Sequence, residues 1–269
     1  MTQAKLRRRL KRLRSRLTSH WLTGFVRHAP LPVIKGNGRG LRVRFGDSNV
    51  SRIVRVIERG AEDSFLELLR PGDVVYDLGA NIGWYSLLAA QRVGPTGKVI
   101  AFEPSVTNAA YIAWNAATNR FANVSVVPAA VSDQDGWAVF LNKGPLESRL
   151  DKDDDETQVQ RRATREQHIR GRTAVPVLTL DSWIAQTAQA PPTLIKMDVE
   201  GAEIGALRGM SQTLRSAKPT LIIEPHGTRQ AVAELLDSFD YEHWPIEHDL
   251  ATGETSWRAH ILATPRRAG

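Results

Sequence analysis

The sequence predicts one α/β domain of the Rossmann-like, doubly wound type, whose mostly parallel sheet ends in an antiparallel pair of strands. From residue 73 onward, short apolar runs alternate with amphipathic stretches of helical period. This alternation is typical of a parallel sheet covered by helices on both faces. The chain has 269 residues, 42% of them hydrophobic, and can therefore bury a substantial core. It has no cysteine, and no apolar run reaches the roughly 18 residues of a membrane-spanning helix.

Each expected strand is an apolar run bounded by turn residues. Strands are expected at residues 74–78, 99–102, 124–131, 138–141, 175–180, 194–197 and 220–224, with the antiparallel pair at 241–246 and 259–264. Helices are expected at residues 82–93, 105–118, 202–217 and 229–239. Ser105 is the predicted N-cap of its helix, and Gly136 is expected in a turn between two strands.

Positive charge is concentrated at the start of the chain. The first 46 residues contain 13 Lys and Arg and no acidic residue, whereas the rest holds 23 basic and 29 acidic side chains. We therefore divide the chain into a basic arm and linker (1–46), with a Gly- and Arg-rich linker at 36–46, and one folded domain (47–269).

Residues 5–17 of the arm have the pattern of a basic amphipathic helix. Its apolar stripe consists of Leu6, Leu10, Leu13 and Leu17. Such a helix suits peripheral contact with an anionic membrane surface, binding to nucleic-acid phosphates, an organelle transit sequence or a solubilising extension without a ligand. These alternatives stay open, and we expect a cytoplasmic protein, with contact to a membrane surface through this segment as one of them.

Residues 142–172 interrupt the alternation of strands and helices. The stretch is charged, is almost without large apolar side chains, and contains the acidic run 151–156. That run lacks the alternating ligands and the glycine of a calcium-binding loop, so we expect a solvated, flexible loop. Its position between strands makes it a candidate lid over a substrate.

The turn after the first strand has the residues of a nucleoside-binding site. Gly79 and Gly83 allow a tight turn and a close approach at the start of the helix. Glu103 ends the second strand, where a carboxylate can accept hydrogen bonds from both ribose hydroxyls. A pyrophosphate-binding turn would have glycine in place of Asn81, and Asp77 would repel the pyrophosphate. S-adenosylmethionine (SAM) has an ammonium, a sulfonium and no phosphate, so the pattern favours SAM over NAD.

Five motifs together resemble the FkbM-type methyltransferases over roughly residues 60–265. They are VVYDLGANIGWYS (74–86), AFEP (101–104), TLDSW (179–183), LIKMDVEGAE (194–203) and LIIEPH (221–226). The resemblance implies a Rossmann-like fold, SAM as cofactor, and O-methylation of a hydroxyl on a sugar, a glycolipid or another natural product. In bacteria such proteins often serve the synthesis of surface polysaccharides or glycolipids. The arm and the charged loop are not part of the family pattern.

The same resemblance implies a set of cofactor-binding positions. It places Asp77, Gly79, Ala80, Asn81, Gly83 and Tyr85 at the methionine part of SAM and Glu103 and Asn108 at the ribose. It places residues 130–133, which include Ala130 and Ser132, near the adenine.

Methyl transfer to a hydroxyl needs a base within hydrogen-bond reach, because the oxygen is a poor nucleophile until its proton leaves. Candidate groups follow two strands: Lys196 and Asp198 at one, Glu224 and His226 at the other. His226 is the predicted general base, because the unperturbed pKa of histidine lies near neutrality. Asp198 is expected to touch cofactor or acceptor, and Lys196 either pairs with a carboxylate or orients the acceptor.

Some of these side chains have a second interpretation. Asp198, Glu200, Glu224 and His226 form a set of oxygen and nitrogen ligands that suits Mg²⁺ or Mn²⁺. Alternatively, Glu200 and Glu203 only complement the dipole of the following helix. We predict a site without a metal and keep the metal site as the alternative.

Other functions fit the sequence less well. An NAD-dependent oxidoreductase on the same fold is disfavoured by Asn81 and Asp77. A nucleic-acid methyltransferase that uses the basic arm is disfavoured by the acidic domain and by the absence of an N/D-P-P-Y/W motif. A membrane-docked scaffold with a silent site would not need Glu103 and Asp198. A measurement of whether the protein binds SAM or NAD would distinguish a methyltransferase from an oxidoreductase.

Overall fold

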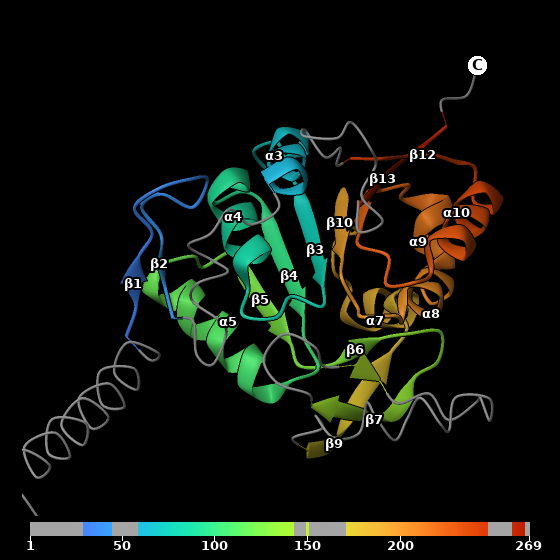
Figure 1. The fold of residues 1–269 in the computed structure, drawn as a ribbon, viewed down its shortest axis with the longest axis horizontal. Helices are drawn as coiled ribbons and strands as arrows, with labels where there is room; N and C mark the ends of the chain where they lie inside the picture. The colour runs from blue at the N-terminus through green and yellow to red at the C-terminus, as the bar shows by residue number, and fades with distance from the viewer. Residues whose placement is uncertain (1–28, 45–58, 143–148, 151–170, 247–259, 267–269) are drawn as a thin grey trace, which may run out of the picture.

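The computed structural model describes residues 29–44, 59–142, 149–150, 171–246 and 260–266. A seven-stranded sheet forms the centre of the molecule (Figure 1). Its strands are β3 (Val74–Leu78), β4 (Lys98–Phe102), β5 (Val124–Val127), β10 (Leu194–Met197), β11 (Thr220–Ile223), β12 (Tyr241–Pro245) and β13 (Ile261–Pro265). The order is β12-β13-β11-β10-β3-β4-β5. Strand β13 pairs antiparallel with β11 and with β12, and all other neighbouring strands are parallel. The predicted fold class and the terminal antiparallel pair are confirmed.

Helices cover both faces of this sheet (Figure 1). One side has α3 (Arg59–Leu68), α4 (Trp84–Val93) and α5 (Val106–Thr118), and the other has α7 (Leu180–Thr187), α8 (Glu203–Arg208), α9 (Ser211–Ser216) and α10 (Arg229–Ser238). Alternate strand residues enter separate cores: Val75 packs with α3 and α4, whereas Tyr76 packs with the opposite helices. Since Ile195 and Met197 also face the α8–α10 side, Lys196 points to the α3–α5 side.

Two predicted elements are each divided in two. Residues 202–217, predicted as one helix, form α8 and α9, which are interrupted after Gly209. A Cβ on Gly209 would lie 1.9 Å from the Ser132 carbonyl oxygen, so glycine is required there although it weakens a helix. Residues 124–131, predicted as one strand, are divided at Pro128, which has no N–H for a strand hydrogen bond.

The residues after Pro128 contribute the first strand of a second, smaller sheet. It contains β6 (Ala130–Val131), β7 (Gly136–Asn142), β8 (Arg149–Leu150) and β9 (Gly171–Leu178), in the order β6-β9-β7-β8. Gly136 was predicted in a turn but pairs with Val177 as the first residue of β7. Helix α7 was not predicted. Thr179 caps it by accepting a hydrogen bond from Ser182 N at 3.2 Å.

Part of the predicted linker is folded. Strands β1 (Leu31–Pro32) and β2 (Arg42–Val43) form a hairpin, and Leu41 and Val43 are buried in the core on the α3–α5 side. Asn115 of α5 and Asn119, the residue that caps the end of this helix, hold β2 in place through hydrogen bonds to the backbone at Arg44 and Arg42. Residues 36–44 therefore belong to the folded unit.

Several predictions lie outside the described residues. These are the amphipathic helix at 5–17, the boundary between residues 46 and 47, and residues 143–148 and 151–170 of the charged loop. Within the part of the chain that the structure describes, no helix has the length and apolar character needed to span a membrane.

Candidate active site

Two glycines shape the turn between β3 and α4. Gly79 has a φ of +78°, and a Cβ there would lie 1.8 Å from the Asp198 carbonyl oxygen. Gly83 has a φ of +88°, and a Cβ there would lie 3.0 Å from Ile112 on α5. Both positions combine a left-handed backbone with a close neighbour, so they need glycine, as predicted from the sequence.

Asp77 is enclosed below this turn. Its side chain is 2% exposed and accepts a hydrogen bond of 2.5 Å from Ser86 Oγ, at the start of α4. Burial raises the pKa of Asp77, while Lys196, its neighbour on β10, lowers it. These contacts join β3 to α4 and β10. The predicted contact of Asp77 with the cofactor stays a prediction.

Glu103 lies at the end of β4, beside the same turn. Its two carboxylate oxygens accept hydrogen bonds of 2.8 Å from the backbone amides of Asn81 and Ser105. The side chain is 5% exposed, and burial raises its pKa to about 7, although hydrogen bonds from Ser105, Asn81 and Asn108 lower it. The carboxylate is thus held in one orientation at the carboxyl edge of the sheet, where α/β folds bind ligands.

The remaining predicted cofactor residues have mainly packing contacts. Ala80 and Ala130 are buried. The ring of Tyr85 lies 4.9 Å from Lys196 Nζ, and the backbone N–H of Ser132 donates to β9 at 2.9 Å. Contacts of these side chains with a cofactor stay predictions.

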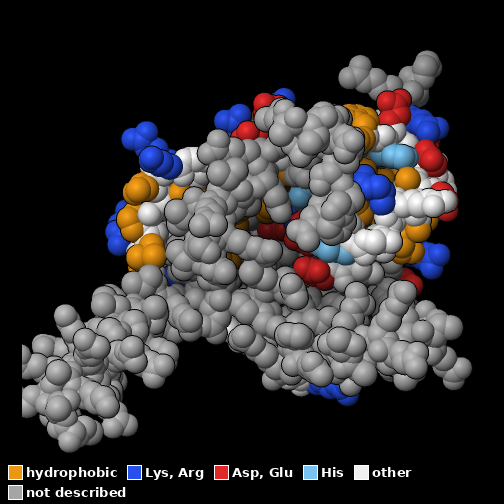
Figure 2. All heavy atoms as spheres, in the orientation of Figure 1, with side chains coloured by type: hydrophobic (Ala, Val, Ile, Leu, Met, Phe, Trp, Pro, Cys, Tyr) orange, Lys and Arg blue, Asp and Glu red, His pale blue; other side chains and the backbone are white. Residues whose placement is uncertain are grey.

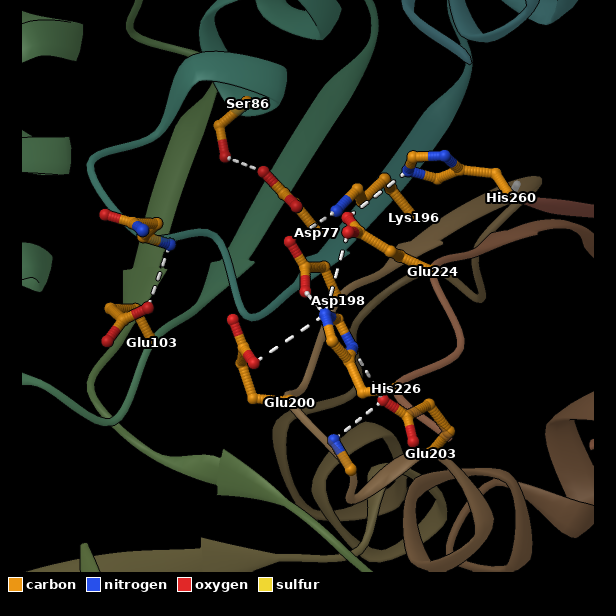
Figure 3. A network of polar contacts seen from close by, with 12 residues as sticks. Asp77, Ser86, Glu103, Lys196, Asp198, Glu200, Glu203, Glu224, His226 and His260 are labelled. Carbon is orange, nitrogen blue, oxygen red and sulfur yellow. Dashed lines mark hydrogen bonds and ion pairs between the residues drawn. The ribbon is translucent and has the colours of Figure 1, made fainter. Parts of the chain in front are cut away.

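A second polar group lies where β10 and β11 end (Figure 3). Lys196 Nζ forms an ion pair with Asp198 Oδ2 at 3.2 Å. His226 Nε2 lies 3.8 Å from Asp198 Oδ1, 3.6 Å from Glu200 Oε2 and 3.6 Å from Glu224 Oε1. The structure therefore brings together all the side chains predicted for catalysis. One ligand atom each from Asp198, Glu224 and His226 lies within 4.8 Å of the others, so these residues are candidate metal ligands.

Glu203 orients the ring of His226. Its carboxylate is fully buried and lies 3.2 Å from His226 Nδ1. It also accepts hydrogen bonds from Gly201 N at 2.9 Å and from Thr228 Oγ1 at 2.8 Å. The alternative that Glu203 only complements a helix dipole is wrong, because this carboxylate directs His226 Nε2 toward the other carboxylates.

His260 was not found by sequence reasoning. It precedes β13, is 1% exposed, and its Nε2 lies 3.4 Å from Glu224 Oε2. Burial raises the pKa of Glu224, but the contact with His260 and the charge of Lys196 outweigh it and lower the pKa to about 2. Only the antiparallel pairing of β13 with β11 brings His260 here, and no local pattern in the sequence indicates it.

The electrostatics of His226 contradict the reason given for its role as base. Burial lowers its pKa, but the hydrogen bond with Glu203 and the charges of Asp198, Glu200 and Glu224 raise it to about 9. The ring is therefore protonated at neutral pH and cannot accept another proton. The expectation of an unperturbed pKa is wrong for this site.

Acidic and histidine side chains gather near the middle of the face shown in Figure 2. The family model of the FkbM methyltransferase domain matches residues 77–244 of this chain, a range that includes both polar groups. The chain belongs to the FkbM methyltransferase family. It is therefore a methyltransferase with the Rossmann-like fold of the SAM-dependent class, and the predicted family and enzyme class are confirmed.

Relatives of this FkbM-family enzyme include two named methyltransferases. Hexuronic acid methyltransferase AglP of Haloferax volcanii is 24% identical over 209 residues, which cover 76% of this chain and 77% of AglP. The 31-O-demethyl-FK506 methyltransferase FkbM of Streptomyces tacrolimicus is 30% identical over 194 residues, covering 62% of this chain and 71% of the relative. The crystal structure of methyltransferase FkbM from Methylobacillus flagellatus KT has a TM-score of 0.49 at 19% identity, covering 73% of this chain but 45% of that one.

Proposed function

We propose that this enzyme transfers the methyl group of SAM to a hydroxyl oxygen of a sugar, a glycolipid or another natural product. The observation that carries the proposal is the contact between two polar groups at one edge of the sheet. Gly79, in the turn beside Glu103, lies directly against the Asp198 backbone, and Asp198 begins the second group. The names of the two relatives support this acceptor class, since one gives a hexuronic acid and the other an O-demethylated natural product.

The residues of the turn fit SAM. Glu103 presents a carboxylate whose orientation is set by backbone amides, which suits the two hydroxyls of a ribose. Asn81 has a φ of +53°, so the turn reaches the left-handed region without the middle glycine that a pyrophosphate requires. When bound, SAM supplies a methyl carbon made electrophilic by the sulfonium.

The second group would act on the acceptor. In-line displacement requires the acceptor oxygen to be aligned with the methyl carbon, and the oxygen must lose its proton. Asp198, Glu200 and Glu224 offer carboxylate oxygens for the hydroxyl hydrogen bond. One of these carboxylates takes the proton, because His226 already carries one. Lys196, which is 3% exposed, offsets part of the negative charge that the carboxylates bring together.

The basic segment 5–17 would give such an enzyme access to a lipid-linked acceptor. A basic amphipathic helix binds anionic membrane surfaces, where a glycolipid is found. We propose this contact only for that segment, and we propose a cytoplasmic location for the catalytic domain.

Calorimetry tests the cofactor assignment. We expect wild-type protein to bind SAM and not NAD, and Glu103→Ala to lose SAM binding while it stays folded. Glu234→Ala, on the exposed side of α10, is the matched control and should bind SAM as wild type does. NAD binding without SAM binding by folded wild-type protein would refute the proposed function. Methyl transfer from labelled SAM to neutral sugars, uronic acids and glycolipids would then identify the acceptor.

A further inference from the structure

Three side chains after β10 and β11 surround a common point. His226 Nε2 lies 3.8 Å from Asp198 Oδ1 and 3.6 Å from Glu224 Oε1, distances too long for hydrogen bonds. All three residues offer one ligand atom within 4.8 Å of the others. Ligands about 2.1 Å from one divalent ion lie about 3 to 4.2 Å from each other, depending on the angle between them. The observed spacing is therefore close to that of a set of ligands around one ion.

Asp198 Oδ1 gives a second, independent indication. This oxygen has less than 1 Å² of exposed area and accepts no hydrogen bond from the described residues. Its partner oxygen, Oδ2, is engaged by Lys196 at 3.2 Å. A carboxylate oxygen that is removed from water and left without a donor is unfavourable, and a bound cation would supply the missing partner.

The surroundings of His226 agree with a ligand role. A metal-binding histidine usually donates its other ring N–H to a carboxylate, which sets the tautomer and the ring orientation. Glu203 takes this position at Nδ1, 3.2 Å away, and its own oxygens are held by Gly201 and Thr228. Nε2 is the ring atom directed toward Asp198 and Glu224 (Figure 3).

We propose that Asp198, Glu224 and His226 bind one divalent cation, Mg²⁺ or Mn²⁺, and that the cation holds the acceptor hydroxyl for methyl transfer. Two carboxylates and one imidazole suit these ions, which leave positions open for substrate oxygens. The imidazolium that His226 forms without a cation releases its Nε2 proton to solvent when the cation binds, because only a neutral ring nitrogen can be a ligand. This inference rests on the proposed function, and it replaces our prediction of a site without a metal.

The cation would make the hydroxyl a better nucleophile. The O–H bond of the coordinated acceptor breaks, and its proton passes to the carboxylate of Glu200, which lies 3.6 Å from His226 Nε2 but is not one of the three ligands. The acceptor oxygen then forms a bond to the methyl carbon. The carbon–sulfur bond breaks with its electron pair on sulfur, which leaves S-adenosylhomocysteine.

Mn²⁺ binding to the full chain, followed by electron paramagnetic resonance after treatment with a chelator, tests the proposal without an activity assay. We expect wild-type protein to bind one Mn²⁺ in competition with Mg²⁺. Asp198→Asn and Glu224→Gln should each weaken Mn²⁺ binding at least about 100-fold, and Glu203→Gln at least about tenfold, since loss of an outer-shell partner alone has that effect. Asp133→Asn, an exposed acid outside the site, should bind Mn²⁺ as wild type does.

Folding is verified for each variant by circular dichroism. If either Asp198→Asn or Glu224→Gln does not fold, Mn²⁺ binding by the other of these two variants decides. Absence of Mn²⁺ binding to folded wild-type protein, or equal binding by a folded Asp198 or Glu224 variant, would overturn the proposal. Both results are independent of SAM binding, which is measured separately. Protein that binds SAM but not Mn²⁺ would therefore retain the proposed function and lose only the metal site.

Discussion

Lowering the pH should weaken binding of the adenosine part of the cofactor, because Glu103 takes up a proton. Burial raises the pKa of Glu103 to about 7. A carboxylate with this pKa is about 90% ionised at pH 8 and about 10% ionised at pH 6. If only the ionised form accepts hydrogen bonds from both ribose hydroxyls, the apparent Kd rises about tenfold between these pH values, which corresponds to about 1.4 kcal/mol.

Methylthioadenosine is a suitable ligand for this assay. It contains the ribose and the adenine but no amino-acid group, whose own α-amino pKa near 8 would complicate a titration with SAM. Calorimetry at pH 8, 7 and 6, with circular dichroism at each pH, measures the effect. Glu103→Gln is the control and should bind weakly with an affinity that does not change over this range. A wild-type affinity that changes less than about twofold, or a Glu103→Gln affinity with the same pH dependence, would refute the reasoning.

The raised pKa of Glu103 affects stability in the opposite direction: ligand binding weakens as the pH falls, whereas the free energy of unfolding rises. The pKa of Glu103 is about 7 in the folded protein and 4.5 for an ordinary glutamate, so the folded state binds the proton more tightly between these values. The contribution of Glu103 to the free energy of unfolding therefore decreases as the pH rises from about 4.5 to about 7. Urea unfolding of wild type and Glu103→Gln at both ends of this window should show the decrease only in wild type.

Three further predictions concern residues that hold the site and the fold. Gly79→Ala should abolish SAM binding or folding, because a Cβ would lie 1.8 Å from the Asp198 carbonyl oxygen. Gly171→Ala is the control: the space around Gly171 is open, so this variant should unfold in urea as wild type does. Ser86→Ala should lower the free energy of unfolding by about 1–3 kcal/mol, since buried Asp77 loses a donor, and exposed Ser238→Ala should change it by less than about 0.5 kcal/mol. Leu41→Ala should lower the free energy of unfolding by about 2–5 kcal/mol, because the Leu41 side chain is 2% exposed. Ile34→Ala is the control and should change it little, because Ile34 is 74% exposed. Equal stability of these two variants would show that the hairpin is not part of the core.

The sequence by itself determined the fold class and the position of the glycine turn after β3, because both depend on local patterns. Apolar runs define the central strands, and each strand of the seven-stranded sheet lies in or close to a run that the sequence indicates. The glycine spacing after β3 and the carboxylate after β4 are also local, and the structure places Glu103 beside the Asn81 amide. The candidates after β10 and β11 could be named for the same reason, since parallel strands end at a common edge.

Only the tertiary structure decided how these candidates interact. The pKa of His226 depends on carboxylates from two separate segments, and their charges act through space rather than along the chain. His260 reaches Glu224 only because β13 pairs with β11. The docking of β2 likewise depends on asparagines in and directly after α5, more than 70 residues further along the chain. Distance and burial determine whether a polar side chain is a base, a positioning residue or a metal ligand, and both arise only when distant segments fold together.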